Sequence, residues 1–133
     1  MRVFLDTNVL ASAFGTRGLC ADVVREVLSA HDLLVSDYLF QELEQVLLQK
    51  FLLPPSLVTD ILALLRQDSI PCEASPSIDL LLKDVDDVPI LSCAINGGAD
   101  MLVTGDKELL GLTKVEDVPI LSPRAFWEHL KGS

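Results

Sequence analysis

Four acidic side chains carry the strongest chemical signal in this sequence. Each falls where we predict a strand to end or a helix to be in its early turns: they are Asp6, Glu42, Asp87 and Asp106. In an open parallel sheet, ligands bind in the crevice at the carboxyl ends of the strands. We therefore expect these four carboxylates to converge at one end of a sheet.

Carboxylates crowded in this way point to a bound metal ion. Their titrations would be coupled and their pKa values raised, and a hard divalent cation relieves that cost. Mg²⁺ or Mn²⁺ prefers oxygen ligands, keeps several waters and bridges to substrate phosphates. Since no catalytic His, Cys or Ser nucleophile accompanies the acids, the pattern favours metal-assisted phosphodiester hydrolysis, in which the metal generates hydroxide.

Each acid also has a structural interpretation. Asp87 and Asp106 suit the N-cap of a helix, and Glu42 suits the solvated flank of one. Asp6 has no capping duty that the sequence reveals, so it is the strongest single candidate. Thr7, Asn8 and Thr104 are residue types typical of turns and caps. The joint placement of the acids is therefore more informative than any one of them.

Alternating strands and helices are predicted to position these acids. Apolar runs predict strands at Val3–Leu5, Leu33–Val35, Ile70–Glu73, Met101–Val103 and Val118–Leu121. Helical spacing predicts helices over Cys20–Ala30, from Ser36-Asp37 to about Phe51, over Ser56–Gln67, Val88–Asn96 and Lys107–Leu110, and after Ser122-Pro123. Strands that alternate with helices indicate an α/β fold with a parallel sheet.

Helical spacing orients two of the acids. Asp87 heads the helix face formed by the residues three, four and seven positions later, which are apolar. Glu42 lies at the edge of an apolar stripe, whereas Glu44 falls on the opposite, solvated side. That stripe consists of Leu39, Leu43, Val46 and Leu47.

One hexapeptide, D-V-P-I-L-S, occurs twice, at Asp87–Ser92 and at Asp117–Ser122. We predict that the first copy starts a helix, because C-A-I-N-G-G continues a helical pattern to a glycine cap. We predict that the second copy is a strand, because Pro123 follows it directly. Asp117 is therefore not a candidate for the site.

Composition bounds the remaining possibilities. A length of 133 residues predicts a single domain over residues 1–133. No apolar run approaches the roughly 18 residues that cross a bilayer, and the start lacks the pattern of a signal peptide. We expect a cytoplasmic protein without a membrane partner.

The net charge of -10 argues against a large basic surface for binding nucleic acid, unless the negative charge is concentrated in a site that metal ions neutralise.

The three cysteines, Cys20, Cys72 and Cys93, are widely spaced and include no C-x-x-C pair. This number and spacing argue against a disulfide framework and against a zinc site. We predict that they behave as small buried hydrophobes.

Three segments together resemble the PIN domain, in particular its stand-alone VapC-type toxins. They read V-F-L-D-T-N-V-L at the start, S-D-Y-L-F-Q-E-L-E-Q-V-L from Ser36, and D-D-V-P-I-L-S-C-A-I-N-G-G-A-D-M-L-V-T-G-D-K-E-L-L from Asp86. The resemblance covers nearly the whole chain. It implies an α/β three-layer sandwich, with a central parallel β-sheet flanked by helices.

The resemblance also implies a site and an activity. Members of the family are metal-dependent ribonucleases, and their acids match the four named above, with Asp86 as the rival of Asp87. Asn8 and Thr104 match positions that support the acids, and Asp100 matches a peripheral one. The implied cofactor is Mg²⁺ or Mn²⁺, and the implied partners are an RNA substrate, an antitoxin protein and a second copy in a homodimer.

Three cations, Arg17, Lys83 and Lys107, flank the candidate site.

Two alternatives remain open on the sequence alone. An aspartate after the first strand also suits a phosphatase or phosphotransferase with Asp6 as the covalent nucleophile. Such enzymes usually place a second aspartate two residues later, where this chain has Asn8. The other alternative is a non-catalytic signalling or scaffold domain whose acids bind only a cation.

Overall fold

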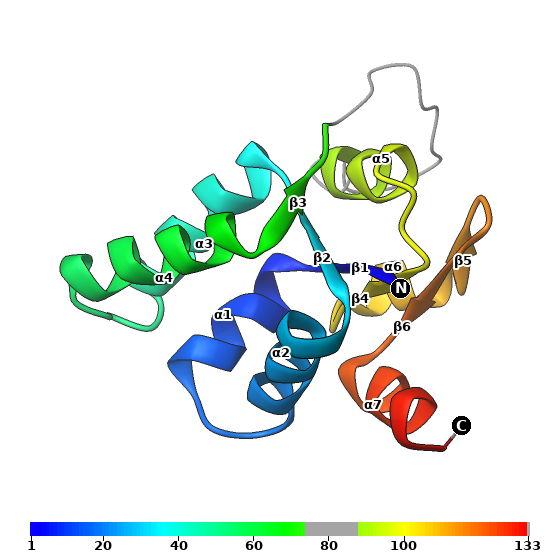
Figure 1. Cartoon of the computed structure of the whole chain (residues 1–133), viewed down its shortest axis with the longest axis horizontal. Helices are drawn as coiled ribbons and strands as arrows, with labels where there is room; N and C mark the ends of the chain where they lie inside the picture. The colour runs from blue at the N-terminus through cyan, green and yellow to red at the C-terminus, as the bar shows by residue number, and fades with distance from the viewer. Residues whose placement is uncertain (74–87, 133) are drawn as a thin grey trace.

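A mostly parallel sheet forms the centre of the computed structural model, which describes residues 1–73 and 88–132 (Figure 1). The order of its six strands is β3-β2-β1-β4-β6-β5. The strands are β1 (Arg2–Leu5), β2 (Asp32–Val35), β3 (Ser69–Pro71), β4 (Met101–Val103), β5 (Lys114–Val115) and β6 (Val118–Leu121). All neighbours pair in parallel except β5 and β6, which are antiparallel. The predicted parallel sheet is confirmed, and β5 is an addition that was not predicted.

The central strand β1 is apolar because helices cover both faces of the sheet. Val3, Phe4 and Leu5 are fully buried. Phe4 is in register with Leu34 of β2 on one side and with Leu102 of β4 on the other. Burial of a side chain of this size stabilises the fold by about 1.5–3 kcal/mol. This packing fixes the carboxyl end of β1 in the middle of the sheet edge.

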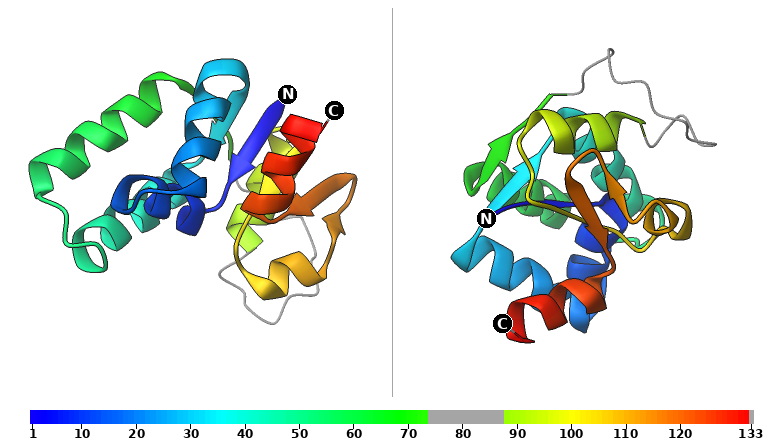
Figure 2. Two further views of the ribbon diagram at one scale, coloured as in Figure 1. Left: turned by 90° about the horizontal axis from the view of Figure 1, so that it is seen from below. Right: turned by 90° about the vertical axis from the view of Figure 1, so that its right-hand side faces the viewer.

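Seven helices cover the sheet over the part of the chain that the structure describes. They are α1 (Thr7–Gly15), α2 (Leu19–Ala30), α3 (Asp37–Gln49), α4 (Pro55–Gln67), α5 (Val88–Asn96), α6 (Lys107–Gly111) and α7 (Pro123–Gly132). Figure 2 shows α2 and α7 on one side of the sheet and α5 on the other. This arrangement confirms the predicted layers of helix, sheet and helix.

The helix starts follow from local capping chemistry. The Ser36 hydroxyl accepts a hydrogen bond from the backbone N–H of Leu39 at 3.1 Å, and Ser122 accepts one from Ala125 at 3.1 Å. Both serines cap the predicted helices. Helix α1, by contrast, was not predicted, since the apolar run after Asn8 was too short to show a helical period.

The two copies of the hexapeptide adopt the two predicted structures. Val88–Asn96 is helical and ends near Gly98, which has a φ of +69°, whereas Val118–Leu121 is a strand. Asp87 itself, together with Asp86 and Lys83, lies outside the described residues. Within residues 1–73 and 88–132, no helix is long and apolar enough to cross a membrane.

A close approach between α1 and the end of α3 sets how these two helices pack. A Cβ atom built on Gly15 would lie 2.3 Å from Cδ1 of the Phe51 ring. Only glycine therefore permits this contact at the end of α1. The contact matters for function because α1 begins at Thr7 and α3 carries Glu42, two residues of the candidate site.

We predict that Gly15→Ala lowers the free energy of unfolding by about 1–3 kcal/mol, since the Phe51 ring must shift to admit a methyl group. The matched control is Gly111→Ala at the end of α6, where a Cβ would meet nothing within 4 Å. Urea denaturation of both variants measures the difference. Equal stability of the two variants would show that the approach of α1 to Phe51 is not a constraint.

Candidate functional site

Asp6 is held at the carboxyl end of β1 by the backbone and by two hydrogen bonds to its carboxylate. Its Oδ1 accepts from the backbone N–H of Thr7 at 2.7 Å, and its Oδ2 accepts from the Thr104 hydroxyl at 2.7 Å. Its own N–H donates to the carbonyl of Val103 at 2.9 Å. The side chain is the N-cap of α1, so the interpretation that Asp6 has no capping duty was wrong. The error follows from the helix that was not predicted.

Thr104 connects Asp6 to Asp106. While its hydroxyl donates to Asp6, the same oxygen accepts from the backbone N–H of Asp106 at 3.0 Å. Asp106 caps α6, and its Oδ1 accepts from the N–H groups of Glu108 and Leu109 at 2.8 and 3.4 Å. Among the described residues its Oδ2 forms no hydrogen bond. The structure thus gives Asp106 its predicted capping role and leaves one of its oxygens open.

Thr7 connects Asp6 to Glu42. The Thr7 hydroxyl donates to Oε1 of Glu42 at 2.6 Å, while its backbone N–H binds Asp6. Glu42 is half-buried on α3, whereas Glu44 is exposed, as the helical stripe predicted. Sequence reasoning treated Thr7 as an ordinary turn residue. Its place at the first position of a helix, directly after an acid, was the signal that could have indicated this linking role.

Burial is the main influence on the charge of Asp6. The side chain is only 5% exposed, and loss of water raises the pKa of its carboxyl group. The hydrogen bonds from Thr104 and Thr7 lower that pKa, and the nearby charge of Asp106 raises it further. Among the described residues no cationic side chain forms an ion pair with Asp6. The negative charge of Asp6 is therefore uncompensated within this part of the chain.

The other predicted residues lie at several places. Asn8 is exposed on α1, and its side chain forms no hydrogen bond to any described residue. Asp100 accepts from the backbone N–H of Arg2 at 2.8 Å, which places it at the opposite end of β1. Arg17 and Lys107 are exposed, and Lys107 follows Asp106 directly. Asp87, Asp86 and Lys83 belong to the segment that is not described.

The donors at this edge fit a hard divalent cation in kind. Carboxylate and hydroxyl oxygens are the groups that Mg²⁺ and Mn²⁺ prefer, and an uncompensated buried carboxylate gains most from such a charge. Within residues 1–73 and 88–132, no three His, Cys, Asp or Glu side chains are grouped closely enough to hold a metal ion. The sequence adds Asp87 outside these ranges as the remaining candidate ligand.

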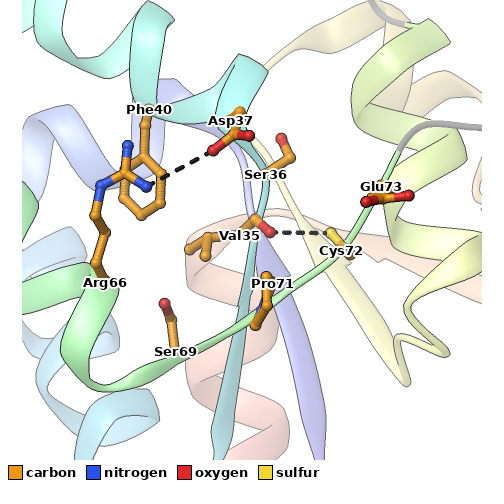
Figure 3. A pocket seen from close by; sticks show the side chains of 9 residues that line it. All are labelled: Val35, Ser36, Asp37, Phe40, Arg66, Ser69, Pro71, Cys72 and Glu73. Carbon is orange, nitrogen blue, oxygen red and sulfur yellow. Dashed lines mark hydrogen bonds and ion pairs between the residues drawn. The ribbon is translucent and has the colours of Figure 1, made fainter.

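A separate cavity of about 280 Å³ opens beside the ends of β2 and β3 (Figure 3). The Arg66 guanidinium stacks over the Phe40 ring at 4.2 Å and lies 3.6 Å from Oδ1 of Asp37. Phe40 and Glu42 are two residues apart on α3 and so face different sides of that helix. The cavity is therefore on the side of α3 away from the contact between Thr7 and Glu42.

Comparison with known proteins agrees with this architecture. The family model for the PIN domain matches residues 2–108. The crystal structure of VapBC2 from Rickettsia felis, bound to a DNA fragment from its promoter, contains a chain similar to this one. The TM-score is 0.63 at 13% sequence identity, over 92% of this chain and 98% of the other, so the likeness shows the fold. A search of the curated proteins finds no match.

We predict that Asp6→Asn raises the melting temperature at pH 7 when a chelator is present. Burial raises the pKa of Asp6 in the folded state, so folding favours the protonated form, and stability is lost as the pH rises through the folded pKa. Each tenfold rise in the proton affinity of Asp6 on folding lowers the free energy of unfolding of the charged protein by about 1.4 kcal/mol. This corresponds to a melting temperature lower by roughly 5 °C for a chain of this size.

The gain in melting temperature of Asp6→Asn over wild type should shrink as the pH falls toward the ordinary pKa of an aspartate. Thermal melts from about pH 4 to about pH 8, roughly one per pH unit, measure this change. The exposed Asp100 provides the matched control, and Asp100→Asn should not raise the melting temperature at pH 7. An Asp6→Asn variant that is less stable than wild type at every pH would contradict the predicted cost of this charge.

Proposed function

The chain belongs to the PIN domain family, whose members are generally nucleases, and on that premise we propose that it is a metal-dependent endoribonuclease. It would hydrolyse phosphodiester bonds of RNA. The observation that carries the proposal is the environment of Asp6, a buried carboxylate at the carboxyl end of the central strand that has no cationic partner among residues 1–73 and 88–132. Such a charge is costly for a purely structural residue and useful for binding a cation.

In this proposal Asp6, Glu42, Asp87 and Asp106 hold Mg²⁺ or Mn²⁺. When bound, the metal supplies an activated water and neutralises charge that develops on the phosphate. Thr7 and Thr104 keep the Asp6 carboxylate in one orientation, since each donates a hydrogen bond to a different oxygen of it. The Oδ2 of Asp106, which forms no hydrogen bond within the described part of the chain, can accept a ligand without loss of the helix cap that Oδ1 provides.

The charge of the chain supports recognition through the site rather than through a basic surface. The net charge is -10, and only ten Lys and Arg residues are present. Lys107, which directly follows Asp106, is exposed and can contact phosphates that flank the cleaved bond, whereas Arg17 lies beyond the far end of α1. The RNA would then be held through metal ions, a few cations and shape.

We also propose an antitoxin protein as the regulatory partner, and a homodimer in the cytoplasm as the working state. The likeness to VapBC2, whose crystal structure is bound to a DNA fragment from the promoter, supports the antitoxin partner, whereas the homodimer and the location follow from the family resemblance alone. Size-exclusion chromatography with light scattering of the purified chain tests the homodimer, and a monomer at all concentrations would count against it.

We predict that a mixed cellular RNA pool is cleaved by the wild-type chain with Mn²⁺ or Mg²⁺ at low salt and is left intact with a chelator. Asp6→Asn, Glu42→Gln, Asp87→Asn and Asp106→Asn should each reduce the rate by more than about 100-fold, since even the outer partners of metal ligands are worth about 10–100-fold. Glu44→Gln, on the solvated side of the same helix, is the matched control and should keep full activity.

The same preparations discriminate the other functions. A phosphate trapped on Asp6, without RNA cleavage under any metal, would favour a phosphotransferase. Cleavage that survives in the folded Asp6→Asn variant would rule out the proposed site. Absence of both reactions in a folded, antitoxin-free chain would favour a scaffold domain.

A further inference from the structure

Two of the three cysteines meet beside the end of β3. Cys72 follows β3, and Cys93 lies in α5. Their side chains are neighbours, because both residues pack against Gly97, and both are buried, with exposed fractions of 9% and 1%. Both are free thiols, as is the half-buried Cys20 of α2. The prediction that the cysteines are small and buried is confirmed for this pair, but it did not indicate that two of them touch.

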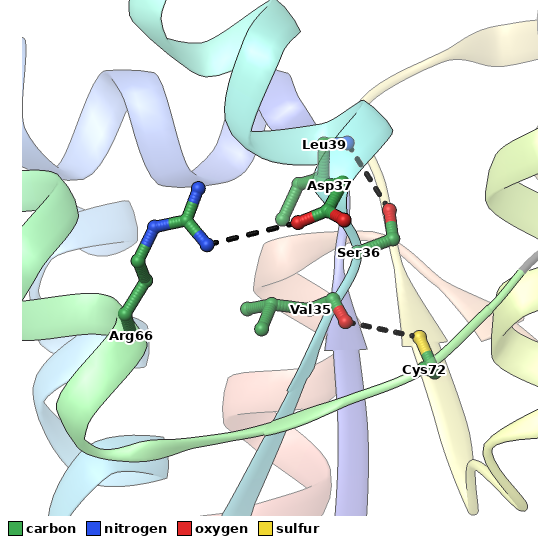
Figure 4. A network of polar contacts seen from close by, with 6 residues as sticks. All are labelled: Val35, Ser36, Asp37, Leu39, Arg66 and Cys72. Atoms are coloured by element: carbon green, nitrogen blue, oxygen red, sulfur yellow. Dashed lines mark hydrogen bonds and ion pairs between the residues drawn. The ribbon is translucent and has the colours of Figure 1, made fainter.

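Several contacts fix the positions of Cys72 and Cys93. The Cys72 backbone N–H donates to the Val35 carbonyl at 2.7 Å, and its thiol donates to the same oxygen at 3.2 Å (Figure 4). The Asn96 side chain donates to the Glu73 carbonyl at 3.0 Å. The last turn of α5 is so close that a Cβ on Gly97 would lie 3.0 Å from Cβ of Cys72. The two cysteines are thus fixed by packing between β2, β3 and α5.

A small reagent can reach this pair. Cys72 is one of the residues that line the cavity of about 280 Å³, whose rim carries the exposed side chains of Asp37 and Glu73 (Figure 3). Hydrogen peroxide is close to water in size, so the cavity admits it. The reagent therefore reaches Cys72, and Cys93 is the neighbour of Cys72 on α5.

The two thiols also influence each other's titration. Their interaction lowers the pKa of Cys93 and raises that of Cys72. The thiolate is the nucleophilic form of cysteine. The second thiol lies beside the first and, once its proton is lost, can resolve the first oxidation product.

We propose that Cys72 and Cys93 form an oxidation site at which a hydroperoxide converts two thiols into an intramolecular disulfide. The thiolate of one cysteine attacks one peroxide oxygen, the O–O bond breaks, and hydroxide leaves with the electron pair. The sulfur of the other cysteine then attacks the sulfenic sulfur of the first, and the S–O bond breaks as hydroxide leaves. The two thiol protons end in two molecules of water, and the two electrons lost by the sulfurs reduce the peroxide.

The disulfide would join the end of β3 to α5 and close a loop from residue 72 to residue 93. Cys72 is bonded to Val35, which directly precedes the cap of α3, so the link ties three elements of the carboxyl edge together. This inference does not depend on the proposed nuclease activity, because it concerns thiol chemistry alone.

The test treats the reduced full-length chain with hydrogen peroxide, blocks the remaining thiols and digests it with trypsin. Mass spectrometry should find the peptides 67–83 and 84–107 joined, with the loss of two hydrogens and release by a reductant. The joined pair should exceed any pair that contains Cys20 by at least about tenfold, since only held neighbours gain from proximity. Cys20→Ser should retain the product, and Cys72→Ala and Cys93→Ala should lose it.

The same reaction in denaturing urea shows whether the joined peptides depend on the packing of the folded chain or only on the short distance between the two cysteines in the sequence. This comparison uses the wild-type chain alone, so no variant has to fold. The yield of the joined peptides should fall several-fold in urea, because the contact between the sulfurs is lost. An equal yield in both conditions would overturn the proposal. So would a folded wild-type chain that forms only sulfinic or sulfonic acid, or only disulfides that involve Cys20.

Discussion

The structure depends on how one buried carboxylate is held. Asp6 gives up most of its hydration and in return receives two hydrogen bonds, from the Thr7 N–H and the Thr104 hydroxyl. These bonds orient the group but do not neutralise it, and the nearby Asp106 makes its charge less favourable. The buried negative charge therefore lowers the stability of the folded protein, and a bound cation would remove this cost.

The rest of the fold places that carboxylate and its neighbours. β1 is buried between β2 and β4, so its carboxyl end, where Asp6 lies, is central in the edge of the sheet. β4 ends beside it and delivers Thr104 and then Asp106. Helix α1 starts at Thr7 and packs against α3, which brings the Thr7 hydroxyl to Glu42. Strand order and one helix contact thus bring together acids that are 36 and 64 positions apart in the chain.

Strong local patterns were predictable from the sequence, and contacts between elements were not. The apolar runs of β1 and β4 and the serine caps of α3 and α7 carry their own signals, as does the different structure of the two hexapeptides. Helix α1 and the antiparallel β5 are short, and the spacing of their apolar residues is too weak a pattern to predict a helix or a strand. The links through Thr7 and the contact between Cys72 and Cys93 arise only when distant segments pack. Membership of the PIN domain family was reached from three segments, and the family model confirms it.

Binding of Mn²⁺ tests the central claim most directly, because it needs neither a substrate nor a known partner. The signal of free Mn²⁺ in electron paramagnetic resonance reports how much the folded chain binds. If the Asp6 charge is the core of a cation site, the wild type binds Mn²⁺ and Asp6→Asn weakens the affinity by more than about tenfold. Asp100→Asn, at the opposite end of β1, should bind like wild type. Equal Mn²⁺ affinity of wild type and Asp6→Asn would contradict the account.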